Sequence, residues 1–418
     1  MRSSQFKILL GGVAVLLSIL ACSTGSTAMP TIATLPPAST GAAGSGTASP
    51  LPETAVPTVA AVPAGPTNTA TPPPVTAAPG LPALPAAASP SIQSLVMLDL
   101  NNGWALTDTG VVRTVDGGTT WFNATPPGLN GAPASPFFLN AGTAWLAAGT
   151  GDPTTGTLYH TTDGGASWST TTVPFGGGSL DFIDAMNGWE MVGLSAGMSH
   201  EAVAIFRSSD AGVTWSRVFI DDPSVAGSTD SLPLVGDKNG ILALDNNHTW
   251  VTGSQPSNDF IYVYASQDGG TSWAHQELAI PPAFSGAMTG ADLPVFFGSS
   301  EGVLPVLLFA NNNGADFYVS HDGGQSWSAT TPVGQGGFLS AASPKDFFVW
   351  DGSAPFSASH DAGASWTTVT PNINIQDNLV SMQFINASTG WALTSDANSH
   401  RMLYKSVDGG ATWTVLIP

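Results

Sequence analysis

The chain has 418 residues, with 9 Lys plus Arg against 29 Asp plus Glu, and its formal net charge is −20. A surface this acidic repels polyanions, which argues against general binding to nucleic acid or to anionic lipid. The chain contains one cysteine, so no intramolecular disulfide supports the fold.

The first 22 residues are predicted to be a targeting segment. Arg2 and Lys7 give a positive start, and an apolar run follows from residue 8 to residue 20. The segment ends in the sequence ILAC at Cys22, which resembles the lipobox of bacterial lipoproteins and implies cleavage before Cys22 and lipidation of its thiol. An uncleaved anchor is the alternative, although the run is short for a membrane span. Both interpretations predict an extracytoplasmic protein anchored to the bacterial cell membrane.

Residues 23–90 consist of Pro, Ala, Thr, Ser and Gly with a single charge at Glu53. This composition lacks hydrophobic periodicity and predicts a disordered or polyproline-like linker. The folded part is therefore predicted to be 91–418.

One motif, x-[ST]-x-D-[GA]-G-x-[ST]-W, occurs seven times in 91–418, with its aspartates 39 to 58 residues apart. Such a period indicates a repeat architecture. Asp-Gly-Gly between β-branched runs predicts a hairpin turn, in which the glycines adopt positive φ without steric cost. The Trp five residues after the Asp can bury a large apolar area. We expect a structural role for both sets: Asp116, Asp163, Asp210, Asp268, Asp322, Asp361 and Asp408, and Trp121, Trp168, Trp215, Trp273, Trp327, Trp366 and Trp413.

A second tryptophan lies upstream of most of these turns, and the fifth repeat has Gly302-Val303-Leu304 in its place. Each repeat then divides into four short strands, which predicts an all-β, seven-bladed β-propeller of four-stranded antiparallel blades. On this division each blade is one continuous repeat, and the ring closes by packing of blade 1 on blade 7. The blades are expected near 91–128, 132–176, 178–222, 230–281, 291–332, 335–370 and 377–418.

The turn resembles the Asp-box, or bacterial neuraminidase repeat. The pairing of a Gly-Trp-Ala strand with a following Asp-box is similar to the photosystem II stability/assembly factor family and its bacterial relatives. The resemblance covers 91–418 and implies a seven-bladed propeller. It also implies that the boxes lie at the blade periphery, away from the central funnel, so they do not transfer an enzymatic activity.

The residues speak against a sialidase, which needs three arginines, a Tyr nucleophile and a Glu partner. The arginines after the targeting segment are Arg113, Arg207, Arg217 and Arg401, and none is predicted on an inner strand. A glycosidase needs only two carboxylates. Candidates outside the boxes are numerous, but no pair stands out: Asp99, Asp108, Asp181, Asp184, Glu190, Asp245 and Asp351. We therefore predict no catalytic residue.

No cofactor or metal is predicted either. The histidines lack metal-ligand spacing. Acidic loops such as Asp221-Asp222 lack the spacing of an EF-type calcium loop and are better explained as solvated turns.

The position three residues before the box Asp differs around the ring. It is basic or can become basic in blades 7, 1, 2 and 3, where it is Lys405, Arg113, His160 and Arg207, and it is Ala or Val in blades 4, 5 and 6. These four residues form a candidate partner-binding arc. The alternative is that each one pairs with nearby turn carboxylates on an exposed surface, where such pairs contribute little.

Together these observations predict a non-catalytic, membrane-tethered propeller that acts as a protein-binding or assembly scaffold. We expect a monomer with a protein partner, and a glycan ligand stays open. The alternative is a carbohydrate-active propeller, either a glycoside hydrolase or a sialidase-like glycan binder.

Overall fold

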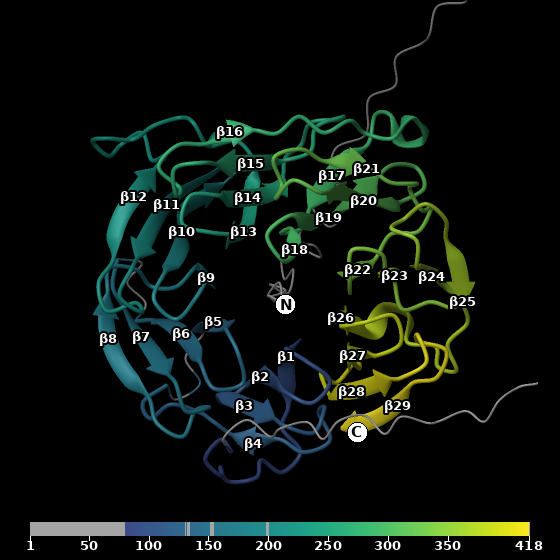
Figure 1. Ribbon diagram of the computed structural model, residues 1–418, viewed down its shortest axis with the longest axis horizontal. Coiled ribbons are helices and arrows are strands. Elements are labelled where there is room, and N and C mark those ends of the chain that lie inside the picture. Colours follow the sequence, from purple (N-terminus) through teal and green to yellow (C-terminus); the bar gives the residue numbers. More distant parts are fainter. Residues whose placement is uncertain (1–79, 130, 132–133, 151–153, 198–199, 418) are drawn as a thin grey trace, which may run out of the picture. The chain divides into compact units, whose positions relative to one another are not determined.

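The computed structural model describes residues 80–417 except 130, 132–133, 151–153 and 198–199. The targeting segment, Cys22 and the linker up to residue 79 lie outside the described residues. Figure 1 shows the strands arranged as blades around a ring. The blades are four-stranded antiparallel sheets, except that blades 4 and 5 are joined into one sheet, and this arrangement confirms the predicted all-β propeller. Within this part of the chain, no helix is long and apolar enough to cross a membrane.

The strands follow each other in chain order, and neighbours in sequence pair antiparallel, as short runs separated by tight turns require. Blades 1 to 3 consist of β1 (Ile92–Met97), β2 (Gly103–Thr107), β3 (Val111–Thr114), β4 (Phe122–Asn123); β5 (Ala134–Phe138), β6 (Ala144–Gly149), β7 (Gly156–Thr161), β8 (Ser169–Val173); and β9 (Ser179–Phe182), β10 (Gly188–Gly197), β11 (His200–Ser208), β12 (Ser216–Ile220).

Blades 4 to 7 consist of β13 (Asp237–Ala243), β14 (Thr249–Ser254), β15 (Val263–Ser266), β16 (Ala274–His275); β17 (Met288–Ala291), β18 (Val295–Phe297), β19 (Glu301–Phe309), β20 (Gly314–Ser320), β21 (Ser328–Ala329); β22 (Phe338–Ala341), β23 (Phe347–Trp350), β24 (Phe356–Ser359), β25 (Thr367–Val369); and β26 (Leu379–Phe384), β27 (Gly390–Ser395), β28 (Arg401–Ser406), β29 (Thr414–Ile417). Two 3₁₀ turns, Pro282–Phe284 and Gln376–Asn378, lie between blades.

Blade 5 departs from the four-strand pattern. Its innermost strand is divided into β17 and β18, which pair with opposite halves of β19. The division falls at Asp292-Leu293-Pro294, where the proline has no N–H to give to the sheet. A single residue pair, Ser254 with Gly290, joins this blade to blade 4.

The start of the folded unit also differs from the predicted boundary at residue 91. Ala87 N–H donates to Trp121 O and Asn123 N–H donates to Pro85 O, both at 2.8 Å, so a short segment lies along the outer edge of β4. The Pro- and Ala-rich composition of this segment does not distinguish it from the linker. The segment lies there because its backbone groups pair with the outer edge of β4, and no local sequence pattern shows that this edge is available.

The Asp-box turn joins the third and fourth strands, and blade 5 shows its construction. Ser320 Oγ donates to Asp322 Oδ1 at 2.8 Å and accepts the N–H of Gly324 at 2.8 Å. Asp322 in turn accepts the N–H and O–H of Ser326 at 3.0 and 2.6 Å. The same hydroxyl bridge from the Ser or Thr to the Asp and the second Gly recurs in the six other blades.

The residue after the box Asp has positive φ in every blade, including the two blades in which it is alanine: Ala211 at 64° and Ala362 at 60°. Its N–H donates to the turn between the first and second strands of the same blade, as from Gly117 to Asn101 O and from Ala211 to Met186 O. This bond also recurs in all seven blades. The two turns are therefore fastened together at one end of each blade.

Five of the six upstream tryptophans form hydrogen bonds toward the next blade, whereas Trp350 donates to Ser353 O within blade 6. Trp145, Trp189 and Trp391 donate their indole N–H at 2.9 Å to Ala211 O, Gly269 O and Gly117 O. Each acceptor is the residue after the box Asp in the following blade. Trp104 reaches Asn140 O of blade 2 at 3.1 Å, and Trp250 reaches blade 5 through Gln276.

The ring closes by side-chain packing and hydrogen bonds, because blades 1 and 7 are separate sheets. Gln383 of blade 7 accepts the N–H of Met97 and donates to its carbonyl, both at 2.8 Å. Trp391 and Leu403 of blade 7 share a hydrophobic cluster with Met97 and Trp121 of blade 1. Trp391 adds its bond to Gly117 O across the same junction.

We predict that Trp391→Phe destabilises the protein more than Trp413→Phe does. Both indoles are buried in inter-blade clusters, at 1% and 3% exposure, but only Trp391 has a hydrogen-bond acceptor among the described residues. Because the two substitutions remove the same atoms, their difference reports the bond to Gly117, about 1 kcal/mol. Denaturant unfolding of both variants measures it. Equal destabilisation would mean that this bond does not contribute to closure.

A second prediction concerns acid stability. Hydrogen bonds from the side chain and backbone of Ser326, and from Ser320, lower the pKa of Asp322 from 3.8 to about 2. Since the folded pKa lies below the unfolded one, ionised Asp322 stabilises the fold above about pH 4, and this contribution is lost as the pH falls toward about 2. Asp322→Asn should therefore be destabilising at neutral pH, and its difference from the wild type should shrink across that window.

Thermal unfolding of the wild type and Asp322→Asn at a series of pH values tests this dependence. Asp108→Asn, in an exposed turn outside the boxes, is the control. A difference for Asp322→Asn that stays constant from neutral pH to pH 2 would contradict the assigned role of the carboxylate.

Candidate functional site

The candidate basic arc lies at the junctions between blades. Arg113, His160, Arg207 and Lys405 stand directly across from the upstream tryptophan of their own blade. Arg207 Cζ lies 4.9 Å from the ring centroid of Trp189, Lys405 Nζ lies 4.9 Å from that of Trp391, and His160 stacks on Trp145 at 4.6 Å. These contacts are cation–π and ring-stacking interactions within the protein.

The cations also contact the following blade. Arg207 Nη2 donates to Asn246 Oδ1 at 2.9 Å, and Lys405 Nζ lies 3.5 Å from Gly117 O. Burial lowers the pKa of Lys405, and the charge of Asp116 in blade 1 opposes that shift. Each cation therefore supports the same junction that the neighbouring tryptophan makes.

Arg113 corrects the prediction of an exposed arc. It is 4% exposed, and its Nη2 donates to Pro82 O at 2.7 Å, so the segment before blade 1 covers it. Burial lowers its pKa, while Asp163 of the next blade opposes that shift. The prediction failed because the position before the box faces the adjacent blade, which the sequence of a single repeat does not show.

Most of the candidate catalytic carboxylates cap backbone turns. Asp99 accepts the N–H groups of Asn101 and Asn102, both at 2.7 Å, and Asp184 and Asp245 repeat this arrangement in blades 3 and 4. Asp351 accepts the N–H of Ser353 at 2.8 Å. These are Asx-type turns, in which the carboxylate satisfies backbone donors.

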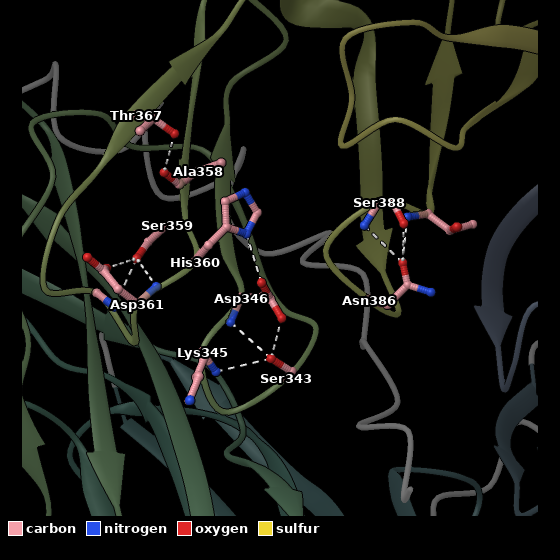
Figure 2. Close-up of polar contacts among 12 residues, drawn as sticks. Ser343, Lys345, Asp346, Ala358, Ser359, His360, Asp361, Thr367, Asn386 and Ser388 are labelled. Atoms are coloured by element: carbon pink, nitrogen blue, oxygen red, sulfur yellow. Dashed lines mark hydrogen bonds and ion pairs between the residues drawn. The ribbon is translucent and has the colours of Figure 1, made fainter. Parts of the chain in front are cut away.

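Figure 2 shows the versions of this first turn in blades 6 and 7. Ser343 Oγ accepts the N–H of Asp346, and the carboxylate of Asp346 also contacts Nδ1 of His360 at 2.8 Å. In blade 7 an amide serves instead, and Asn386 Oδ1 accepts the N–H of Ser388 at 2.9 Å. The amide of Asn386 forms the same kind of hydrogen bonds, so this turn does not require a negative charge at its first position.

Asp181 has a different structural role on the innermost strands. Its Oδ2 accepts the N–H of Ala243 in the next blade at 2.7 Å. Ser179 binds the N–H of Ile241 in the same way at 3.1 Å, and Ser340 binds that of Phe384 at 2.9 Å. Small polar side chains therefore cover backbone donors along the inner edges of several blades. Of the two remaining candidates, Glu190 is fully buried on β10 and Asp108 is exposed.

The sequence did not predict the buried ion pair of Asp221 and Lys238, and the loop that holds Asp221 differs from its prediction. Asp221 was predicted to be a solvated turn residue, but it is 3% exposed and lies 3.8 Å from Nζ of Lys238, which is also buried. The one sequence feature that could have indicated this pair was Lys238 itself, because the chain has very few lysines and arginines. In the described part of the chain, no group of three His, Cys, Asp or Glu side chains could hold a metal ion.

Exposed apolar side chains gather at the turn end of the blades. Five of the eight large hydrophobic residues that are exposed in the described part of the chain lie in a first turn or an Asp-box turn. They are Leu100, Val115, Met186, Val213 and Val407. We call the end of the propeller that bears the first turns and the Asp-box turns the turn face.

Comparison with known proteins supports the fold. A family model for the BNR/Asp-box repeat matches residues 318–329, and a search of curated proteins found no match. The structure "YCF48 bound to D1 peptide" has 18% identity and a TM-score of 0.50, with 78% of this chain and 95% of that chain covered.

Two further solved structures match this chain with lower TM-scores. YCF48 from Cyanidioschyzon merolae has 17% identity and a TM-score of 0.44, covering 67% of this chain and 83% of its own. The Niastella koreensis GH74 enzyme has 14% identity and a TM-score of 0.46, covering 80% and 67%. The repeat match and the ring of antiparallel blades together show that the chain is an Asp-box β-propeller with a fold similar to that of YCF48.

Proposed function

We propose that this protein is a non-catalytic propeller that binds a protein partner outside the cytoplasm while tethered to the membrane through a lipidated Cys22. The proposal that the protein is not an enzyme is supported by the hydrogen bonds that the candidate carboxylates make within the protein. Asp99, Asp184, Asp245 and Asp351 cap turns, and Asp181 bonds to the next blade. An acid–base pair needs carboxylates that face a substrate, and these face backbone donors of the protein itself.

The partner is proposed to dock on the turn face near the junction of blades 7 and 1. Leu100 and Val407 lie in turns on the two sides of this junction, at 49% and 68% exposure. Gly117 connects the turn of Leu100 to blade 7, because its N–H donates to Asn101 O and its carbonyl accepts the indole N–H of Trp391 on β27. A rigid frame that presents apolar side chains suits protein binding, because little ordering is left for the moment of association.

The relative with the similar fold supports a protein ligand. That protein, YCF48, was solved bound to a D1 peptide. That propeller therefore accommodates a peptide, which supports the proposal of a protein ligand for the present chain.

We predict that Leu100→Glu with Val407→Glu reduces partner recovery at least tenfold, which corresponds to about 1.4 kcal/mol. Full-length protein would be recovered from detergent-solubilised membranes of its host, and co-purified proteins would be quantified by mass spectrometry. Val415→Glu is the matched control, because Val415 is an exposed valine of blade 7 on β29, away from the turns.

Two results would contradict this proposal. One is equal recovery of the same partners with the turn-face and control variants. The other is turnover of a glycan panel by the purified protein that a single carboxylate substitution abolishes, which would support the carbohydrate-active alternative.

Lipidation of Cys22 can be tested separately from partner binding. If Cys22 is lipidated, the wild type sediments with membranes, and Cys22→Ala releases the propeller or leaves an unprocessed precursor that retains its targeting segment. Fractionation followed by mass measurement of the N-terminus separates these forms. A Cys22→Ala protein with the same processed N-terminus and membrane association as the wild type would rule out lipidation at this residue.

A further inference from the structure

A buried lysine and a buried aspartate meet where blade 3 packs against blade 4. Lys238 Nζ lies 3.8 Å from Asp221 Oδ2, and the two side chains are 0% and 1% exposed. Asp221 follows the last strand of blade 3, and Lys238 stands on the first strand of blade 4. The surroundings are apolar and aromatic, with Phe219 and Tyr262 in the adjoining cluster.

The amine is held in place by backbone carbonyls. Lys238 Nζ donates to Glu201 O, and to Pro233 O, Leu234 O and Gly236 O at 2.8, 3.1 and 3.3 Å. The N–H of Lys238 is fixed by Glu201 Oε2 at 2.6 Å. Both the side chain and the backbone of Lys238 are therefore immobilised beside the carboxyl group, which is the condition for an efficient reaction between neighbours.

The two oxygens of Asp221 are in different environments. Oδ1 accepts the N–H of Val203 at 2.5 Å, whereas Oδ2, the oxygen nearer the amine, has no hydrogen-bond partner among the described residues. A backbone N–H on Oδ1 polarises the carboxyl carbon and stabilises negative charge that develops on that oxygen, as an oxyanion hole does. Oδ2 is then the oxygen free to leave.

We propose that Lys238 and Asp221 condense to an intramolecular isopeptide bond between Nζ and Cγ. The ammonium group first transfers a proton to Oδ2, which leaves a neutral amine beside a neutral carboxylic acid. The nitrogen lone pair attacks Cγ while Val203 N–H stabilises the charge on Oδ1. A second proton then passes from nitrogen to the leaving oxygen, the Cγ–Oδ2 bond breaks, and one water departs. No oxidant, reductant or co-reactant is required.

Burial reduces the free-energy cost of the first proton transfer. It raises the pKa of Asp221 to about 6 and lowers the pKa of Lys238, which brings the two pKa values closer together, while the attraction between the two charges opposes both shifts. The carbonyls around Nζ act in the other direction, because an ammonium group can donate to more of them than an amide can. Burial also keeps bulk water, the reagent of the reverse reaction, away from the bond.

The bond would join two neighbouring blades covalently around the loop 222–237. The chain has one cysteine, Cys22, which lies in the targeting segment, so no disulfide can serve this purpose. A crosslink that closes a loop stabilises the fold chiefly by restricting the unfolded chain. Such protection suits an extracytoplasmic protein, and the crosslink itself does not depend on the proposed partner or on lipidation.

The test is the mass of the purified full-length protein under denaturing conditions, followed by a peptide map. We expect the wild type to be lighter by one water than the mass calculated for its processed chain with the N-terminus that the peptide map identifies, with residues 221 and 238 in one branched peptide. Lys238→Arg keeps the positive charge but cannot form this amide, and it should have the full mass. Lys345→Arg changes an exposed lysine and should keep the branched peptide.

Two outcomes would overturn the proposal. The first is a wild type of full mass whose residues 221 and 238 appear in separate linear peptides, which would leave the pair as a buried salt bridge. The second is a loss of water that the map assigns elsewhere, such as a cyclised aspartate. Because both readouts come from the wild-type chain, poor folding of Lys238→Arg would not decide the result.

Discussion

The fold depends on one peptide unit, the residue that follows the Asp of each box. Positive φ at this residue turns its N–H toward the first turn of its own blade and its carbonyl outward. In blades 1, 3 and 4 that carbonyl accepts the indole N–H of the preceding blade. A single backbone unit thus joins two turns within a blade and, in these blades, one blade to the next. The hydroxyl and the carboxylate of the box hold this unit in its conformation.

The same turns give many of the aspartates of this acidic chain a structural role. The aspartates of the boxes and first turns accept backbone N–H groups at the ends of short strands, where a sheet cannot supply acceptors. Among the few cations, Arg207 and Lys405 lie over tryptophans at blade junctions, and Lys238 lies inside a cage of carbonyls. These acidic and basic side chains bond to the protein's own backbone or rings, and the exposed apolar side chains of the turn face are the feature on which we propose that a partner docks.

The repeat and its turn could be predicted from the sequence because their determinants are local. Asp322, Ser320 and Gly324 lie within five consecutive positions, and the hydroxyl, carboxylate and glycine each have a definite part in closing a tight turn. The seven copies, spaced by roughly one four-stranded blade, then determined the propeller and its order of strands. The same reasoning placed Arg113 wrongly in an exposed arc, because Arg113 is buried by a segment that does not belong to its own repeat.

By itself the sequence determined the fold class, the number of blades and the structural role of the boxes, since each rests on spacing along one stretch of chain. The tertiary structure alone decided which side chains meet across a junction. In the folded chain Trp391 donates to Gly117 O, Arg113 donates to Pro82 O, and Lys238 is buried beside Asp221. The physical reason is that these contacts join residues of different repeats, and their partners are set by the relative placement of whole blades and not by any local pattern.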